Sequence, residues 1–154
     1  MFLKLASKTA RLFFIFPFLL TFANAQVFIN EFHYDNAGTD QDEGIEVAGV
    51  AGTDLSCYKI LLYNGSNGLV SNTLTLSGTI PDVCNGYGTV WFPSSLQNGS
   101  PDGFALVLDS SLCGGGSSVS VIQFLSYEGV MVANNGDAVG MTSDSLPIAE
   151  SNST

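Results

Sequence analysis

The sequence is poor in the residues on which catalysis and nucleic-acid binding most often depend. It has a single histidine, His33, and four lysine or arginine residues against 14 aspartates and glutamates. Three of the four cations lie within residues 1–11, so Lys59 stands alone against all 14 acids in the rest of the chain. Because proteins bind DNA and RNA through lysine and arginine side chains that displace phosphate counterions, we expect no direct binding of nucleic acid.

Catalytic motifs are missing as well. The chain contains no G-x-S-x-G, no H-E-x-x-H and no glycine-rich phosphate loop that opens a helix. A Ser-His-Asp arrangement would need His33, whose F-H-Y setting is more typical of a structural histidine. Paired carboxylates can be proposed among any 14 acids, so that pattern has no specificity. We therefore expect no catalytic residues, and no cofactor other than the calcium ion considered below.

Helical periodicity is absent too, and short β-type runs take its place. Runs rich in β-branched and aromatic residues are separated by Gly, Asn, Asp and Pro, and Asn-Gly or Asp-Gly pairs such as Asp102-Gly103 supply tight turns. The sequence therefore predicts one all-β domain, an antiparallel sandwich or barrel. The expected strands are 27–34, 44–50, 58–63, 69–76, 89–92, 104–108 and 119–125, with a weaker candidate at 138–141.

Two of these runs carry expectations about which side chains face the core. Alternation over 27–34 places Val27, Ile29 and Glu31 on one face and the even-numbered residues on the other. Trp91 in T-V-W-F is expected in the core, since one tryptophan beside alternating aliphatic residues is typical of a sandwich interior. The alternative is an aromatic platform for sugars, formed by Trp91, Phe92, Tyr58, Tyr63, Tyr87 and Tyr127.

The first 25 residues are typical of a secretion signal. A positively charged start is followed by an apolar run at 12–22 and by Ala23-Asn24-Ala25, with small residues at both positions that a signal peptidase inspects. The run is too short for a membrane anchor, because about 20 helical residues are needed to cross about 30 Å of hydrocarbon. We expect residues 1–25 to be removed, the domain at 26–154 to be secreted to an extracellular location, and no membrane span to remain.

Export would carry three cysteines into an oxidising compartment, where disulfides form. Cys84 and Cys113 lie beside the glycine-rich turns C-N-G-Y-G and C-G-G-G, so loop mobility favours that pair over pairs that involve Cys57. The connectivity stays open, because sequence alone does not decide it. A zinc site is not expected, since there is no C-x-x-C and only one histidine.

The densest polar stretch, at 33–46, lies between the first two expected strands and contains five carboxylates. Calcium takes about 6–8 oxygen ligands, and acids at alternate positions of a loop can surround such an ion. A solvated hairpin loop on an acidic protein would have the same composition, and the acid spacing is not that of an EF-hand. The candidate calcium ligands are Asp35, Asp40, Asp42 and Glu43.

Longer motifs run along the chain: INEFHYDNAGTDQDEGIEVAG, AGTDLSCYKILLYNGSNG, TLTLSGTIPD, NGYGTVWF, LQNGSPDGFALV and VIQFLSYEG. Together they resemble the bacterial branch of the lamin tail domain family, over about residues 27–150. The resemblance implies an immunoglobulin-like β-sandwich in a secreted protein. In that family the domain often accompanies an endonuclease/exonuclease/phosphatase or other hydrolase domain, or calcium-binding and cell-surface modules.

The family is defined by its fold, so the resemblance brings no catalytic residues. This chain departs from the family pattern at Cys57, where glycine is usual, and at Gly44-Ile45, where Phe-Val or Phe-Ile is usual. Members continue past the E-S-N-x-T stretch into a closing strand, so we expect a fragment, or a copy truncated at its last strand. The matching polar residues, expected to shape strand ends and turns, are Asn30, Glu31, Glu46 and Asp54.

Three functional hypotheses follow. The first is a secreted, non-catalytic interaction module that holds a partner protein domain or a cell-surface or extracellular component. The second is the N-terminal accessory part of a secreted hydrolase whose catalytic domain lies beyond residue 154. The third is a calcium-dependent carbohydrate-binding module.

Overall fold

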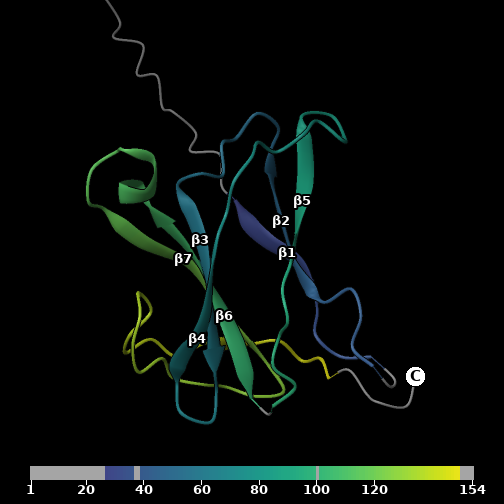
Figure 1. Cartoon of the computed structure of the whole chain (residues 1–154), viewed down its shortest axis with the longest axis vertical. Coiled ribbons are helices and arrows are strands. Elements are labelled where there is room, and N and C mark those ends of the chain that lie inside the picture. The colour runs from purple at the N-terminus through teal and green to yellow at the C-terminus, as the bar shows by residue number, and fades with distance from the viewer. Residues whose placement is uncertain (1–26, 37–38, 100, 150–154) are drawn as a thin grey trace, which may run out of the picture.

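The computed structural model describes residues 27–36, 39–99 and 101–149, which form two packed β-sheets with a single 3-10 turn (Figure 1). The predicted secretion signal at 1–25 lies outside these residues. None of the helical segments in the described part has the length and apolar character needed to cross a membrane. The elements are β1 (Phe28–His33), β2 (Gly44–Val50), β3 (Tyr58–Asn64), β4 (Leu69–Thr75), β5 (Tyr87–Pro93), β6 (Asp102–Asp109), η1 (Ser110–Cys113), β7 (Val119–Tyr127) and β8 (Asp144–Ser145).

The predicted all-β sandwich is confirmed. The smaller sheet has the order β1-β2-β5, and the larger has the order β4-β3-β6-β7-β8. All pairs are antiparallel except β7 with β8, which is parallel. The last expected strand was wrong: 138–141 belongs to a turn, in which Met141 N–H donates to the Ala138 carbonyl at 2.9 Å, and the edge strand is β8.

Two apolar clusters account for the packing. The main core lies between the sheets and includes Ile45 and Val47 of β2 with Ile60, Phe104 and Leu106 of the larger sheet. The second cluster lies on the opposite face of the larger sheet, so β3 and β6 bury side chains on both faces. This explains why these strands read as continuous apolar runs rather than as alternating ones.

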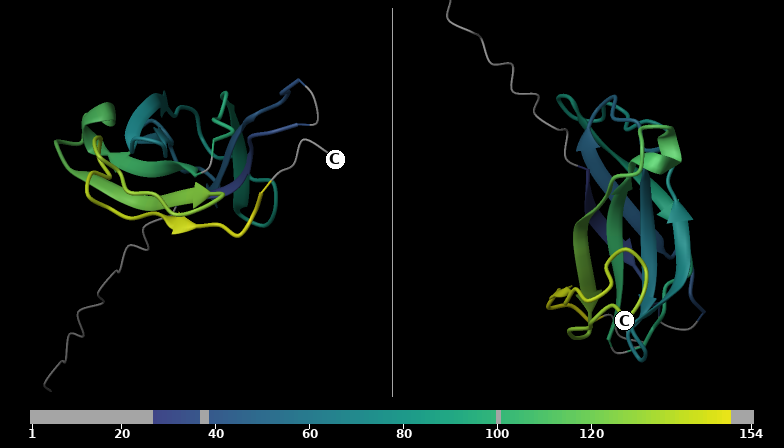
Figure 2. Two further views of the ribbon diagram at one scale, coloured as in Figure 1. Left: turned by 90° about the horizontal axis from the view of Figure 1, so that it is seen from below. Right: turned by 90° about the vertical axis from the view of Figure 1, so that its left-hand side faces the viewer.

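Residues 130–143, here called the covering segment, close the outer face of the larger sheet. Met131, Ala133 and Ala138 are buried there against Tyr63 and the side chains of β6 and β7. The segment is held by backbone hydrogen bonds as well, including Asn134 N–H to the Gly68 carbonyl at 2.7 Å. In Figure 2 this yellow-green segment runs along the larger sheet. In the described part of the chain, neither buried cluster includes side chains from the outer face of the smaller sheet.

A β-bulge at Asn30 changes the predicted faces of β1. Ile29 pairs with Val47 and Glu31 pairs with Glu46, so Asn30 has no opposite residue. The extra residue shifts the alternation by one position. Phe32 therefore packs against the core beside Ile29, while Glu31 points to the solvent side. The expectation that Glu31 shares a face with Ile29 was wrong for this reason.

The disulfide joins Cys57 to Cys113, with the two Cα atoms 5.0 Å apart, and Cys84 is free and exposed. The expected Cys84–Cys113 pair was wrong because sheet topology decides which cysteines meet. Cys57 immediately precedes β3, and Cys113 ends the 3-10 turn that follows β6, the strand paired with β3. Cys84 lies before β5, which belongs to the other sheet.

Candidate functional site

The outer face of the smaller sheet carries the only tryptophan of the chain. Val90 and Phe92 pack against the core, so the residue between them in β5 faces outward. Trp91 is partly exposed, and the expectation that it lies in the core was wrong. Alternation predicts that Trp91 and its two neighbours lie on opposite faces, but it does not say which face is buried.

Strand register places two acidic side chains in line with this indole. Glu31 of β1 lies opposite Glu46 of β2, and Glu46 lies opposite Trp91 of β5. The three residues form one row across the outer face. Within it, the Asn30 amide donates a 2.7 Å hydrogen bond to Oε1 of Glu46. The bulge at Asn30 thus turns Glu31 outward, and the Asn30 side chain supplies a hydrogen-bond partner for Glu46.

Gly44 provides the surface on which the indole rests. A Cβ atom at this position would lie 2.7 Å from Cζ2 of Trp91 and 2.6 Å from the carbonyl oxygen of Phe92. Only glycine leaves enough room for the ring to lie this close to the β2 backbone. A larger residue at position 44 would therefore displace the tryptophan.

These residues surround an open groove, here called the Trp91 groove, of about 610 Å³. Its lining combines one aromatic ring with one imidazole and three carboxyl groups. The residues are Glu31, His33, Asp42, Glu46 and Trp91. Such a mixture can stack a flat ligand and attract a positive charge at the same point.

A second groove, here called the acidic-loop groove, has a volume of about 410 Å³ and is lined by Asp40, Gln41, Asp42, Glu43, Pro93, Ser94 and Ser95. Three of the four predicted calcium ligands lie here, and Asp42 lines both grooves. The fourth, Asp35, is buried elsewhere and accepts a hydrogen bond from the Asn98 amide at 3.3 Å. Among the described residues, no three His, Cys, Asp or Glu side chains are grouped so that they could hold a metal ion.

Glu43 anchors the acidic loop to the segment after β5. Its backbone carbonyl accepts from Ser94 N–H at 3.1 Å, and its Oε2 accepts from Leu96 N–H at 3.3 Å. Oε1 is buried without a hydrogen-bond partner. Burial is the main influence on this carboxyl group and raises its pKa, while the Leu96 N–H lowers it and nearby Asp40 raises it further.

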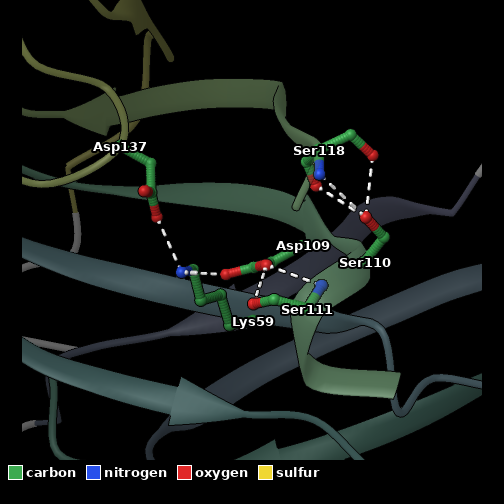
Figure 3. A network of polar contacts seen from close by, with 6 residues as sticks. All are labelled: Lys59, Asp109, Ser110, Ser111, Ser118 and Asp137. Carbon is green, nitrogen blue, oxygen red and sulfur yellow. Dashed lines mark hydrogen bonds and ion pairs between the residues drawn. The ribbon is translucent and has the colours of Figure 1, made fainter. Parts of the chain in front are cut away.

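The chain's one lysine outside the first eleven residues does not serve either groove. Lys59 Nζ lies 2.7 Å from Asp109 Oδ2 and 3.0 Å from Asp137 Oδ2. Figure 3 shows the ammonium group between the two carboxylates, with Asp109 bonded in turn to Ser111. Asp137 belongs to the covering segment, so this network lies on the outer face of the larger sheet. The acids of the Trp91 groove lie on the opposite side of the sandwich.

Sequence reasoning missed one buried acid. Asp102-Gly103 was expected to be a turn, but both residues belong to β6, and Asp102 is only 3% exposed. Its Oδ1 accepts from Gly65 N–H at 2.8 Å, and the Gly99 N–H also acts on this carboxyl group. The side chain borders a small pocket of about 150 Å³. An Asp-Gly pair is so common in turns that its pattern could not have indicated a strand.

No protein-family model, curated protein or solved structure matches this chain. The resemblance to the lamin tail domain family therefore stays a prediction from the sequence motifs.

Proposed function

We propose that this chain is a secreted, non-catalytic interaction module of lamin-tail-like, immunoglobulin-like type, and that it binds a partner protein through the Trp91 groove. The observation that carries the proposal is the position of the only tryptophan. An indole partly exposed on an open sheet face gives up the apolar burial that it would gain in the core. A partner that covers the ring would recover this burial.

The two outer faces of the sandwich support this choice of surface. The larger sheet has its own cover, residues 130–143, which buries an apolar cluster. The smaller sheet instead presents a tryptophan beside charged groups. Tryptophan is among the residues most enriched at the energetic centres of protein interfaces, where a surrounding polar rim excludes water.

Site-specific photo-cross-linking tests this function. A photoreactive residue is placed at partly exposed Thr89, on the same face of β5 as Trp91, and, as a control, at exposed Thr73 of β4. After irradiation with the extracellular fraction of the source cells, we expect a discrete adduct from position 89 alone. Excess unlabelled wild-type protein should compete this adduct away, and a Trp91→Ala protein should not. Identical adducts from both positions, or equal competition by the variant, would contradict the proposal.

A carbohydrate-binding module is the second candidate, because Trp91 lies next to the groove that holds Asp40, Asp42 and Glu43. In that case calcium would have to draw these acids together, because no three acidic side chains of the described residues are grouped to hold a metal ion, and the indole would stack on a sugar ring. Calcium should then raise the melting temperature beyond an ionic-strength control, since a ligand that binds only the folded state stabilises it. An unchanged melt would leave the protein-interaction proposal as the only candidate.

A further inference from the structure

We propose that the Trp91 groove recognises an arginine side chain of the partner, with its guanidinium group stacked on the indole and held by the carboxylates of Glu31 and Glu46. This assignment rests on the proposed function and names the partner chemistry for the same groove. The structural basis is the juxtaposition of a partly exposed tryptophan and two acids in one row across β1, β2 and β5.

The first support is a like-charge pair. Glu31 and Glu46 lie directly opposite each other on neighbouring antiparallel strands, and like charges in such positions destabilise a sheet. The Asn30 amide binds Glu46, but it carries no charge and leaves the repulsion in place. A cation bound between the two carboxylates would remove the repulsion. The pair is thus costly in the free protein and favourable in a complex.

The second support is the way in which the indole is placed. Gly44 lets the ring lie against the β2 backbone, in the same groove as the acids. A cation above the face of tryptophan is attracted by the negative face of the ring, and tryptophan is the strongest aromatic partner for this contact. A ring that already packs against the backbone in the free protein loses less conformational freedom when the ligand binds.

No lysine or arginine lines the Trp91 groove in the described part of the chain. Lys59 is the only lysine or arginine beyond residue 11, and its ammonium group binds Asp109 and Asp137 on the other side of the sandwich. His33 also lines the groove. An incoming cation therefore meets carboxylates that no lysine or arginine of residues 27–149 neutralises. The field of the whole acidic chain would also speed its approach.

Arginine fits this combination better than lysine. Its guanidinium group is planar, stacks on aromatic faces and can donate to two carboxylate oxygens in parallel. Lysine offers a compact, strongly hydrated charge that cannot stack on a ring. A groove with one flat ring and two adjacent carboxylates matches the planar cation.

The test uses the full chain, whose single tryptophan reports directly on the groove. The probe is a synthetic peptide of alternating glycine and arginine, and its twin has citrulline, a neutral isostere, at each arginine. We expect the arginine peptide to change the tryptophan emission in a saturable way. The citrulline twin should bind at least about tenfold more weakly, because it keeps the shape but loses the charge. A peptide with lysine at the same positions should fall between the two.

Variants separate the groove from the general acidity of the surface. Glu31→Gln should weaken arginine-peptide binding about fivefold and at the same time raise the melting temperature of the free protein, because it relieves the like-charge pair. Asp144→Asn removes the same charge from exposed β8 of the other sheet and should change binding less than about twofold. Calorimetry should show that Trp91→Ala loses most of the affinity and that Trp91→Phe keeps part of it.

Three results would overturn the arginine assignment: equal binding of the citrulline twin, equal weakening by Asp144→Asn and Glu31→Gln, or unchanged tryptophan emission. The second of these would mean that only diffuse charge attraction is present. The cross-linking experiment distinguishes this failure from failure of the proposed function. A position-89 adduct that the arginine peptide cannot compete away would keep the interaction module and reject arginine as its ligand.

Discussion

The ammonium group of Lys59 lies 2.7 Å from Oδ2 of Asp109, and this contact joins the start of β3 to the end of β6. Asp137, 3.0 Å away, adds the covering segment to the same network. Burial alone would lower the pKa of Lys59, but the hydrogen bonds to Asp109 and Asp137 outweigh it and raise the pKa. Lys59 thus links β3, β6 and the covering segment.

Replacing Lys59 with methionine is expected to lower the free energy of unfolding, because it leaves the Asp109 carboxylate without its cation. The hydrogen bonds from Lys59 and then from Ser111 lower the pKa of Asp109 from 3.8 to about 2. Since the folded pKa is depressed, this stabilisation is present above about pH 4 and disappears as the pH falls towards 2. Urea unfolding between pH 2 and 7 measures this effect. As the pH falls from about 4 towards 2, the free energy of unfolding should decrease less in the variant than in the wild type. The double variant Lys59→Met/Asp109→Asn should recover part of the lost stability at pH 7.

Loss of the Cys57–Cys113 bond is expected to destabilise the domain by about 2–4 kcal/mol, the usual range for a cross-link that closes a loop of this length (56 residues of separation). Cys57→Ser measures this loss in chemical denaturation. The control is Cys84→Ser, which should change the stability by less than about 0.5 kcal/mol because the side chain is exposed and forms no disulfide. Alkylation of the native protein without a reducing agent should label one cysteine. Labelling of Cys57 or Cys113 instead of Cys84 would show that the pairing is different.

Asp102→Asn is expected to stabilise the protein at neutral pH. Burial raises the pKa of Asp102, the N–H groups of Gly65 and Gly99 lower it, and Glu128 raises it again, so the net shift is upward. A raised folded pKa means that Asp102 favours folding most below its ordinary pKa of 3.8, and that this contribution is lost as the pH rises through the folded value. The gain from the variant should therefore vanish below about pH 4. Asp144→Asn on exposed β8 is the matched control, and an equal gain there would point to net charge as the cause.

Gly44→Ala is expected to cost about 1–3 kcal/mol, the usual range for an added methyl group in a packed site. The new Cβ would meet the Phe92 carbonyl oxygen at 2.6 Å and the Trp91 ring at 2.7 Å. Because the ring must move, the tryptophan emission should change along with the melting temperature. Gly115→Ala offers a control, since its Cβ would approach no atom closer than 3.3 Å. An unchanged spectrum in Gly44→Ala would mean that the indole does not rest on this glycine.

The strands were predictable because their signal is local. Each run from 44–50 to 119–125 appears in the structure with boundaries shifted by a few residues, since β-branched and aromatic residues favour the extended backbone wherever the chain places them. The expected strand at 138–141 failed because a short apolar stretch looks the same in a strand and in a turn packed on a sheet. Met131, Ala133 and Ala138 are apolar because they cover the larger sheet.

The candidate site was only partly predictable. The acidic residues were noticed from their density, and three of them line the acidic-loop groove. Two residues that line the Trp91 groove were predicted on the wrong face of their strands. Trp91 was expected in the core, and Glu31 was expected on the same face as Ile29. Both errors concern which of the two alternating sets of side chains faces the core. An alternating pattern does not decide this when both faces of a strand carry apolar residues. Within β1, the bulge at Asn30 also reversed which residues face the core.

The sequence by itself determined the class of the fold, the order of the strands along the chain and the strongly acidic charge, because these depend on residue types and on local backbone preference. The tertiary structure alone decided which cysteines pair, which face of β5 is buried, and that Glu31, Glu46 and Trp91 share one row. Each of these depends on the pairing of strands that are far apart in the sequence. The physical reason is that sheet register brings such residues together through backbone hydrogen bonds, which every residue except proline can make, so the side chains carry little record of the pairing.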